Sequence, residues 1–136
     1  MESRLYKIEK QDHCILVEFE KGMEISPDVI IEAMDHENEL YEIKGRYDLW
    51  DFRGCFPTPN FGYDAMSRVI EHIISNYSGN WSDKTALLVD DAIQYGLSRM
   101  FQILADGYPT HIGIFQDEAD ARLWISQKLT SEGKGQ

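Results

Sequence analysis

The hydrophobic positions along the chain follow two patterns, short apolar runs and longer stretches with a helical period. Apolar runs of this length are typical of buried strands, whereas apolar residues spaced three and four apart are typical of amphipathic helices. Five runs predict strands, over residues 5–8, 14–19, 47–52, 85–89 and 110–115. The run at 85–89 is expected to be buried on both faces, as strands of a parallel sheet are.

Four helices are expected between and after these strands. The first begins at Ser26, a typical N-cap residue, which is followed by Pro27 at the first helical position. We expect it to end near Gly45, because glycine often follows the last turn of a helix. The other three are expected over residues 66–77, over residues 93–104 and from Asp117 onward.

The resulting order of elements is β-β-α-β-α-β-α-β-α. Strands that alternate with helices predict an α/β fold with a mixed, mostly parallel sheet covered by helices. The first strand is expected to pair antiparallel with the second through a turn near Gln11. A chain of 136 residues has the length of one domain. We therefore expect a single domain over residues 1–130 and a frayed polar tail over residues 131–136.

The charge of the chain restricts its partners. It has 13 Lys and Arg residues against 24 Asp and Glu residues, for a net charge of -11. Nucleic acids and anionic membrane surfaces attract basic proteins, so neither is an expected partner. No apolar run approaches the roughly 20 residues of a membrane span. The first residues lack the apolar segment of a secretory signal, which predicts a cytoplasmic protein.

No pattern in the sequence indicates a catalytic centre. The chain has neither a Gly-x-Ser-x-Gly nucleophile motif nor a glycine loop of the kind that binds phosphates. Its four histidines and two cysteines do not have metal-ligand spacing. We therefore expect no catalytic residue, no bound metal and no cofactor, and we favour a non-enzymatic binding or regulatory module.

One alternative is a magnesium-dependent enzyme. Asp51 lies near the end of one expected strand, and Asp90 and Asp91 follow the next one. Ligands of open α/β sheets bind beyond the carboxyl ends of the strands. Carboxylate oxygens are suitable ligands for Mg²⁺. The same aspartates are also common as helix caps and as solvent-exposed side chains, which we consider their usual role here.

Several short sequence motifs, and their order along the chain, resemble those of the SpoIIAA-like family of STAS-related domains. They are Leu-Trp-Asp-Phe-Arg-Gly at 49–54, Tyr-Gly-Leu-Ser-Arg-Met at 95–100, and the strand ending at Phe115 with Ala121 and Trp124 beyond it. The resemblance extends over nearly the whole chain. It implies a STAS-like fold and a regulatory role, because STAS domains include anti-sigma-factor antagonists.

The same resemblance also shows where this chain departs from STAS domains. STAS domains are regulated through an Asp-Ser-Ser-Gly motif, in which a kinase phosphorylates a serine. The corresponding stretch here runs from Thr58 to Gly62 and contains no serine, so a serine phospho-switch is not expected. The relation in fold to Sec14-type lipid-binding domains implies an apolar ligand cleft by analogy.

The loop over residues 55–63 is the preferred binding site, because aromatic side chains on a loop can close a pocket or anchor a partner. Tyr95 and Arg99 share a helix face, and arginine is a preferred ligand of anions. The candidate binding residues are Thr58, Asn60, Phe61, Tyr63, Tyr95 and Arg99. The expected partner is another protein or a small apolar or anionic ligand.

Three alternatives stay open at this site. The aromatic residues of the loop can equally pack down as a satellite of the core, and Arg99 can pair with Asp91 instead of a ligand. The loop can also be the interface of a homodimer, so the chain is expected to be a monomer or a homodimer.

Overall fold

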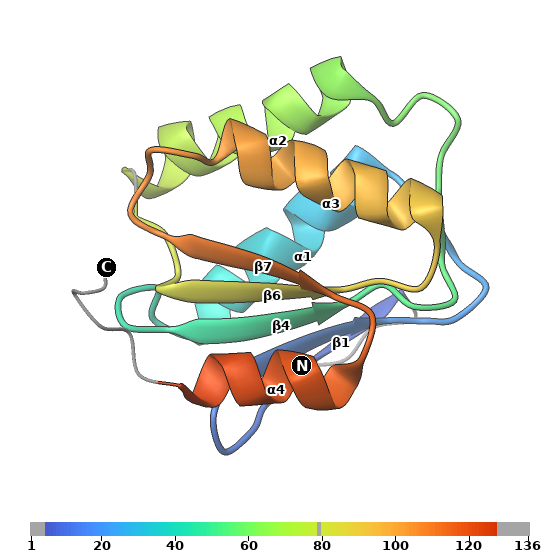
Figure 1. Cartoon of the computed structure of the whole chain (residues 1–136). Helices are drawn as coiled ribbons and strands as arrows, with labels where there is room; N and C mark the ends of the chain where they lie inside the picture. Colours follow the sequence, from blue (N-terminus) through green and yellow to red (C-terminus); the bar gives the residue numbers. More distant parts are fainter. Residues whose placement is uncertain (1–4, 79, 128–136) are drawn as a thin grey trace.

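A mixed sheet of five strands forms the centre of the computed structural model, which describes residues 5–78 and 80–127 (Figure 1). The strand order is β1-β2-β4-β6-β7. Their bounds are Tyr6–Lys10, Ile15–Phe19, Tyr47–Asp51, Lys84–Leu88 and His111–Phe115. β1 runs antiparallel to β2, and the remaining neighbours are parallel. The mixed, mostly parallel sheet expected from the sequence is thereby confirmed.

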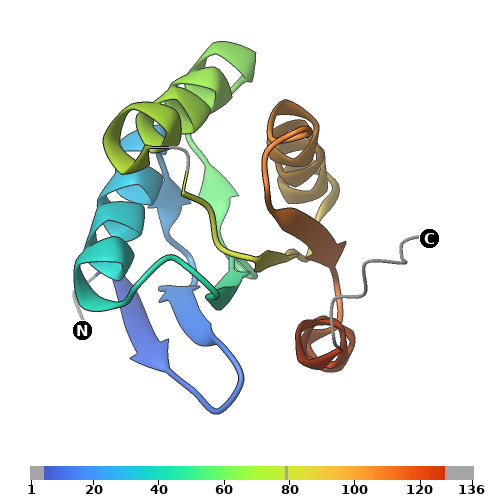
Figure 2. The same cartoon turned by 90° about the vertical axis from the view of Figure 1, so that its left-hand side faces the viewer.

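Helices cover both faces of the sheet. α1 (Pro27–Leu40), α2 (Tyr63–Tyr77) and α3 (Ala92–Leu104) lie on one face, and α4 (Glu118–Ser126) lies alone on the other (Figures 1 and 2). Within the described ranges, no helix is long and apolar enough to cross a bilayer.

Side-chain caps fix where three of the helices begin. Ser26 Oγ accepts a hydrogen bond from the Val29 amide at 3.2 Å, as the N-cap prediction requires. Asp91 and Asp117 cap α3 and α4 in the same way. The first helix ends at Leu40, earlier than the predicted end near Gly45. Its last turn stops because the residue after Leu40 adopts extended backbone angles, and Gly45 instead has a positive φ of 76° in the turn before β4.

A second, two-stranded sheet was not expected. β3 (Glu24–Ile25) pairs in parallel with β5 (Phe56–Pro57). The amides of Phe56 and Thr58 donate to the carbonyls of Met23 and Ile25 at 3.1 and 3.0 Å. Strands of two residues are too short to show the alternation of apolar and polar residues by which a strand is predicted. Their effect is to hold the 55–63 loop against the body of the domain.

The alternation of side chains along each strand divides the core into two parts. In β4, Asp48 and Trp50 face α1–α3, whereas Leu49 faces α4. In β6, Leu87 and Leu88 divide in the same way. The α1–α3 side contains most of the buried aromatic side chains. The α4 side is smaller and is built mainly from aliphatic side chains.

Candidate functional site

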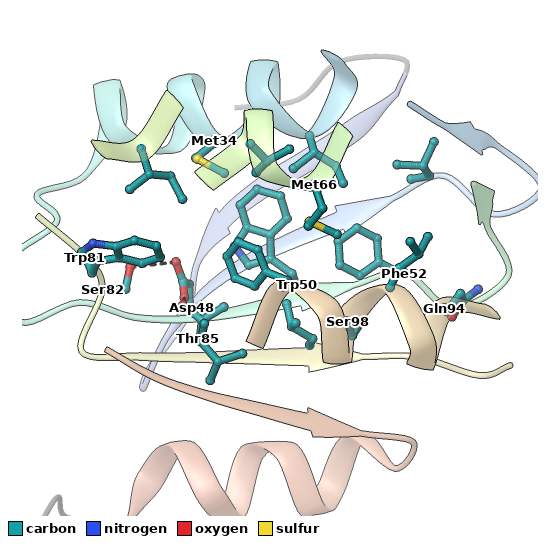
Figure 3. Close-up of a pocket in the computed structure, with 18 of the residues that line it drawn as sticks. Met34, Asp48, Trp50, Phe52, Met66, Trp81, Ser82, Thr85, Gln94 and Ser98 are labelled. Atoms are coloured by element: carbon teal, nitrogen blue, oxygen red, sulfur yellow. Dashed lines mark hydrogen bonds between the residues drawn. The ribbon is translucent and has the colours of Figure 1, made fainter. Parts of the chain in front are cut away.

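A pocket lies inside the larger core, between the sheet and helices α1–α3 (Figure 3). It contains about 130 Å³ of space that the centre of a water molecule can reach. That volume is close to the roughly 150 Å³ of an engineered apolar cavity that binds benzene. The pocket is therefore large enough for a small organic molecule.

Aromatic and sulfur-containing side chains form the middle of the pocket. Trp50 and Phe52 of the β4 region stack with ring centroids 6.2 Å apart, and Phe101 of α3 faces them. Met34 and Met66 contribute flexible thioethers from α1 and α2. Methionine side chains adapt to ligands of different shape, so this wall is suited to an apolar body.

A buried polar cluster occupies one end of the pocket, where α1 and α2 end and β4 and β6 begin. Arg46 Nε donates to Ser82 Oγ at 3.0 Å and lies 3.6 Å from Asp48 Oδ2. Asp48 also accepts hydrogen bonds from the Ser82 hydroxyl at 3.0 Å and the Thr85 hydroxyl at 2.6 Å. The Asp48 carboxylate is thus held by two hydroxyl donors and by the charge of Arg46, while only 2% of the residue is exposed.

Glu37 of α1 adds a second acid behind this cluster. Its Oε1 lies 3.3 Å from Arg46 Nη2, its Oε2 has no hydrogen-bond partner, and the residue is 1% exposed. Burial, and then the negative charge of Asp48, raise the pKa of the Glu37 carboxyl well above its usual value, against the opposing effect of Arg46. Buried acids with a shifted pKa beside a cavity are candidates for functional groups.

Two further polar atoms at this end lack partners. Trp81 Nε1 and Asn38 Oδ1 are buried without a hydrogen bond, and both residues line the pocket. Buried polar groups in native proteins are nearly always paired with protein, water or a ligand. These two atoms can therefore pair with a water molecule or with a polar group of a ligand.

The opposite end of the pocket is neutral. Gln94 of α3 donates to the Cys55 carbonyl at 2.6 Å and accepts from the Asp90 amide at 2.8 Å, so it ties α3 to the 55–63 loop. Ser98 lies one turn further along α3, and it is buried and faces the pocket (Figure 3). Its hydroxyl makes no hydrogen bond to another described residue, and it remains available to a ligand.

The structure separates the six predicted binding residues. Phe61 is buried and lines the pocket. The Thr58 amide helps to pin the loop to β3, while Asn60 and Tyr63 are exposed. Tyr95 and Arg99 lie on the outer side of α3, away from its buried Gln94 and Ser98. Of the six, only Phe61 lines the pocket.

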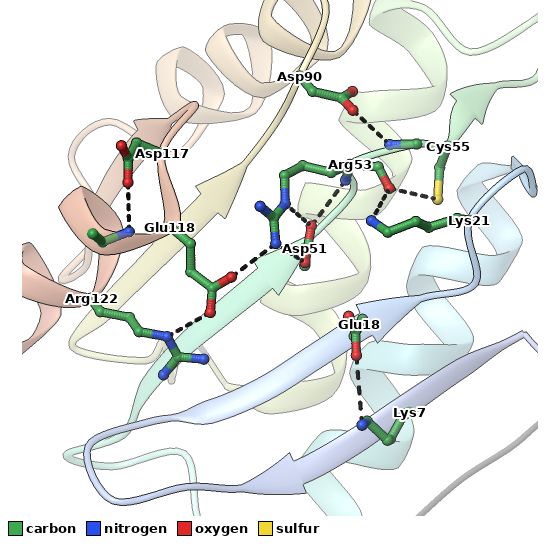
Figure 4. A network of polar contacts seen from close by, with 12 residues as sticks. Lys7, Glu18, Lys21, Asp51, Arg53, Cys55, Asp90, Asp117, Glu118 and Arg122 are labelled. Atoms are coloured by element: carbon green, nitrogen blue, oxygen red, sulfur yellow. Dashed lines mark hydrogen bonds and ion pairs between the residues drawn. The ribbon is translucent and has the colours of Figure 1, made fainter.

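The strand-end carboxylates have separate partners (Figure 4). Asp51 accepts two hydrogen bonds from the Arg53 guanidinium, at 3.0 and 2.9 Å. Asp90 accepts from the Gly54 amide at 2.9 Å, and Asp91 caps α3. No group of three or more His, Cys, Asp or Glu side chains is placed to hold a metal ion in the part of the chain that the structure describes. These aspartates stabilise loops and helix ends.

The polar cluster was not predicted from the sequence, although two of its members, Glu37 and Asp48, stand at unusual positions in the sequence. Glu37 occupies the apolar face of α1, four residues after Ala33, where a charge is unexpected. Asp48 stands beside Leu49 and Trp50 in a strand that is otherwise buried. A charged side chain at a core position is rarely buried without a partner. Two such positions, with Arg46 nearby, indicate a buried ion cluster.

Comparison with known proteins identifies the fold. No family model and no curated protein matches the chain. A crystal structure matches over 92% of this chain and 98% of the other, with a TM-score of 0.54 and 19% sequence identity. It is that of an uncharacterized protein of the DUF3478 family, with a SpoIIAA-like fold, from Shewanella loihica PV-4. The likeness shows that this chain has a SpoIIAA-like fold, as the sequence resemblance implied.

Proposed function

We propose that this chain is a binding module that holds a small, largely apolar molecule in the pocket between the sheet and helices α1–α3. The observation that carries the proposal is a hollow of about 130 Å³ within the larger core. Protein interiors normally leave few voids larger than a water molecule. An apolar cavity with a few polar groups at its ends is the usual form of a small-molecule site.

The pocket also reaches the surface of the molecule. Phe56 is one of the lining residues, and 48% of its surface is exposed. It belongs to β5, which is held by only two residues of pairing with β3. A ligand therefore has a short path from solvent, past Phe56, into the apolar interior.

A matched pair of substitutions tests the proposal. Ser98→Leu fills the pocket from α3, and Ser126→Leu places the same side chain on the exposed, opposite face of the domain. Benzyl alcohol is a suitable probe because its ring has the size of the cavity. Calorimetric titration is expected to show one binding site in the natural chain and in Ser126→Leu, and none in Ser98→Leu.

Equal binding by both variants would contradict the proposal, as would the absence of binding to the natural chain at millimolar probe. Thermal unfolding provides the control for folding. Ser98→Leu is expected to keep or raise the melting temperature, because leucine fills empty space and is a better helix former than serine.

A second candidate function is self-association, and a specific surface favours it. Phe56, Tyr63 and Ile93 lie at one end of the molecule and are 48%, 61% and 64% exposed. Clustered exposed apolar side chains often mark an interaction surface. Sedimentation at low and high concentration tests it, with Tyr63→Ser as the variant. A concentration-dependent dimer that this substitution dissociates supports self-association, and a monomer at every concentration contradicts it.

A further inference from the structure

The charges around the pocket indicate the chemistry of its ligand, an inference that rests on the proposed function. Among the described residues that line the pocket, Arg46 and Asp48 carry the only charges. Both lie at the end where β4 and β6 begin, and Figure 3 shows Asp48 there beside Ser82 and Trp81. The polar group of a ligand therefore meets these two side chains or the neutral Gln94 and Ser98 at the other end.

Protein groups already hold the Arg46 guanidinium in place. Its Nε is bonded to Ser82, its Nη1 donates to the Tyr41 carbonyl at 3.3 Å, and its Nη2 lies 3.3 Å from Glu37 Oε1. Each nitrogen of the guanidinium thus has a protein partner. An anion at this end would also approach the two acids, Glu37 and Asp48, which disfavours a carboxylate or phosphate there.

Acceptors are in excess at the same end. A carboxylate offers about four lone-pair sites, and Asp48 accepts two hydrogen bonds, from the Ser82 and Thr85 hydroxyls. Glu37 Oε2 and Asn38 Oδ1 have no partner at all. Against these acceptors stands one unpaired donor, Trp81 Nε1, which a water molecule can satisfy. A ligand that brings hydrogen-bond donors is therefore the better complement.

The balance of charge points the same way. The cluster contains two acids and one guanidinium, so a cation is the group that would balance it with both acids ionised. Burial, and then the negative charge of Asp48, raise the pKa of Glu37, and a cation bound beside the two acids would favour the ionised form of both. The Trp81 ring at this end, and the Trp50 ring in the middle of the pocket, can add cation–π attraction.

We propose that the ligand is a small apolar amine, whose ammonium group lies at the Asp48 end of the pocket while its hydrocarbon or aromatic body fills the space between Trp50 and α3. The net charge of -11 supports this choice, since it raises the local concentration of cations near the protein.

Three probes with the same ring and different head groups test the inference. Benzylamine is a cation at pH 7, benzyl alcohol is neutral and benzoate is an anion. Calorimetric titrations of the natural chain are expected to give a dissociation constant for benzylamine about tenfold lower than that for benzyl alcohol, and no measurable binding of benzoate. Charge-assisted hydrogen bonds are roughly twice as strong as neutral ones, which is the reason for the difference.

Substitutions at the two acids show whether this end of the pocket causes the preference. Asp48→Asn is expected to raise the dissociation constant of benzylamine about tenfold and to leave that of benzyl alcohol unchanged. If Asp48→Asn does not fold, Glu37→Gln serves instead, because it keeps the shape of the protonated acid, and a threefold loss for benzylamine is then expected. Glu71→Gln removes an exposed acid of α2 and is the control that keeps the preference.

The outcomes separate the two proposals. Benzyl alcohol or benzoate binding as tightly as benzylamine overturns the amine inference and leaves the pocket as a binding site. A preference for benzylamine that persists in the folded acid variants also overturns it, since the attraction would then come from elsewhere. Failure of all three probes to bind overturns the proposed function itself.

Discussion

The two faces of the sheet are built by the same strands and yet differ in kind. On the α4 side, Leu49, Ala86 and Leu88 are fully buried and form one apolar cluster with Ala121 of α4. On the α1–α3 side, larger aromatic residues surround a hollow, and two acids and an arginine are buried at one end of it. Closely packed aliphatic residues stabilise a fold, whereas a hollow and buried charges lower stability. We infer that the α4 side supplies stability and the α1–α3 side supplies function.

The largest effect is expected from breaking the buried ion cluster. Arg46→Leu leaves Glu37 and Asp48 without their counter-charge, and losing one partner of a buried ion pair costs about 3–5 kcal/mol. Chemical denaturation measures this loss. Arg68→Leu removes an exposed arginine from α2 and is expected to change stability by less than about 0.5 kcal/mol. A loss below about 1 kcal/mol for Arg46→Leu would mean that the cluster is not buried as described.

Two neighbouring leucines of β6 compare the faces directly. Leu88→Ala removes a side chain from the closely packed α4 side, and a loss of about 3–4 kcal/mol is expected. Leu87→Ala enlarges an existing pocket, and about 2 kcal/mol is expected because Leu87 already borders empty space and makes fewer contacts. Denaturation of both variants measures the difference. An equal or larger loss for Leu87→Ala would contradict the contrast between the faces.

The stability of the folded chain is also expected to depend on pH through Glu37. In the folded chain its pKa is raised by burial and by Asp48, whereas the unfolded chain ionises it near the ordinary value of 4.5. The folded state therefore binds more protons above pH 4.5, and its stability falls as the pH rises towards the raised pKa, by at most about 1.4 kcal/mol per pH unit. Glu37→Gln removes this dependence.

Denaturation of both proteins between pH 5 and pH 8 tests this prediction. Because other titrating groups are shared, the stability of Glu37→Gln relative to the natural chain is expected to increase with pH. A difference that stays constant across this range would show that Glu37 has an ordinary pKa in the folded chain.

The fold was largely predictable from the sequence, and the site was not. Ser26, Asp91 and Asp117 are local signals, since a cap depends on bonds to amides within three residues. The pocket depends instead on how side chains from α1–α3 and from five strands (β3 to β7) meet, and no local hydrophobic period indicates this. The sequence indicates four candidate residues on the 55–63 loop and two, Tyr95 and Arg99, on the third helix, and of these six only Phe61 lines the pocket.

The polar cluster illustrates the same limit. Arg46, Asp48 and Ser82 come from segments up to 36 residues apart, and only the parallel pairing of β4 with β6 brings them together. The sequence shows each as an ordinary polar residue, and Glu37 as one of many acids. Their common burial is a property of the tertiary structure.

The three tryptophans provide the most direct test of the pocket, because they report on both faces at once. Trp50 and Trp81 line the pocket, whereas Trp124 packs against Phe115 on the α4 side. Titration with benzyl alcohol, followed by the indole N–H signals in a nitrogen-15 correlation spectrum, is expected to shift the signals of Trp50 and Trp81 to saturation and to leave that of Trp124 unchanged. Unmoved pocket signals at millimolar probe, or equal shifts of all three, would contradict the existence of a binding site on the α1–α3 side.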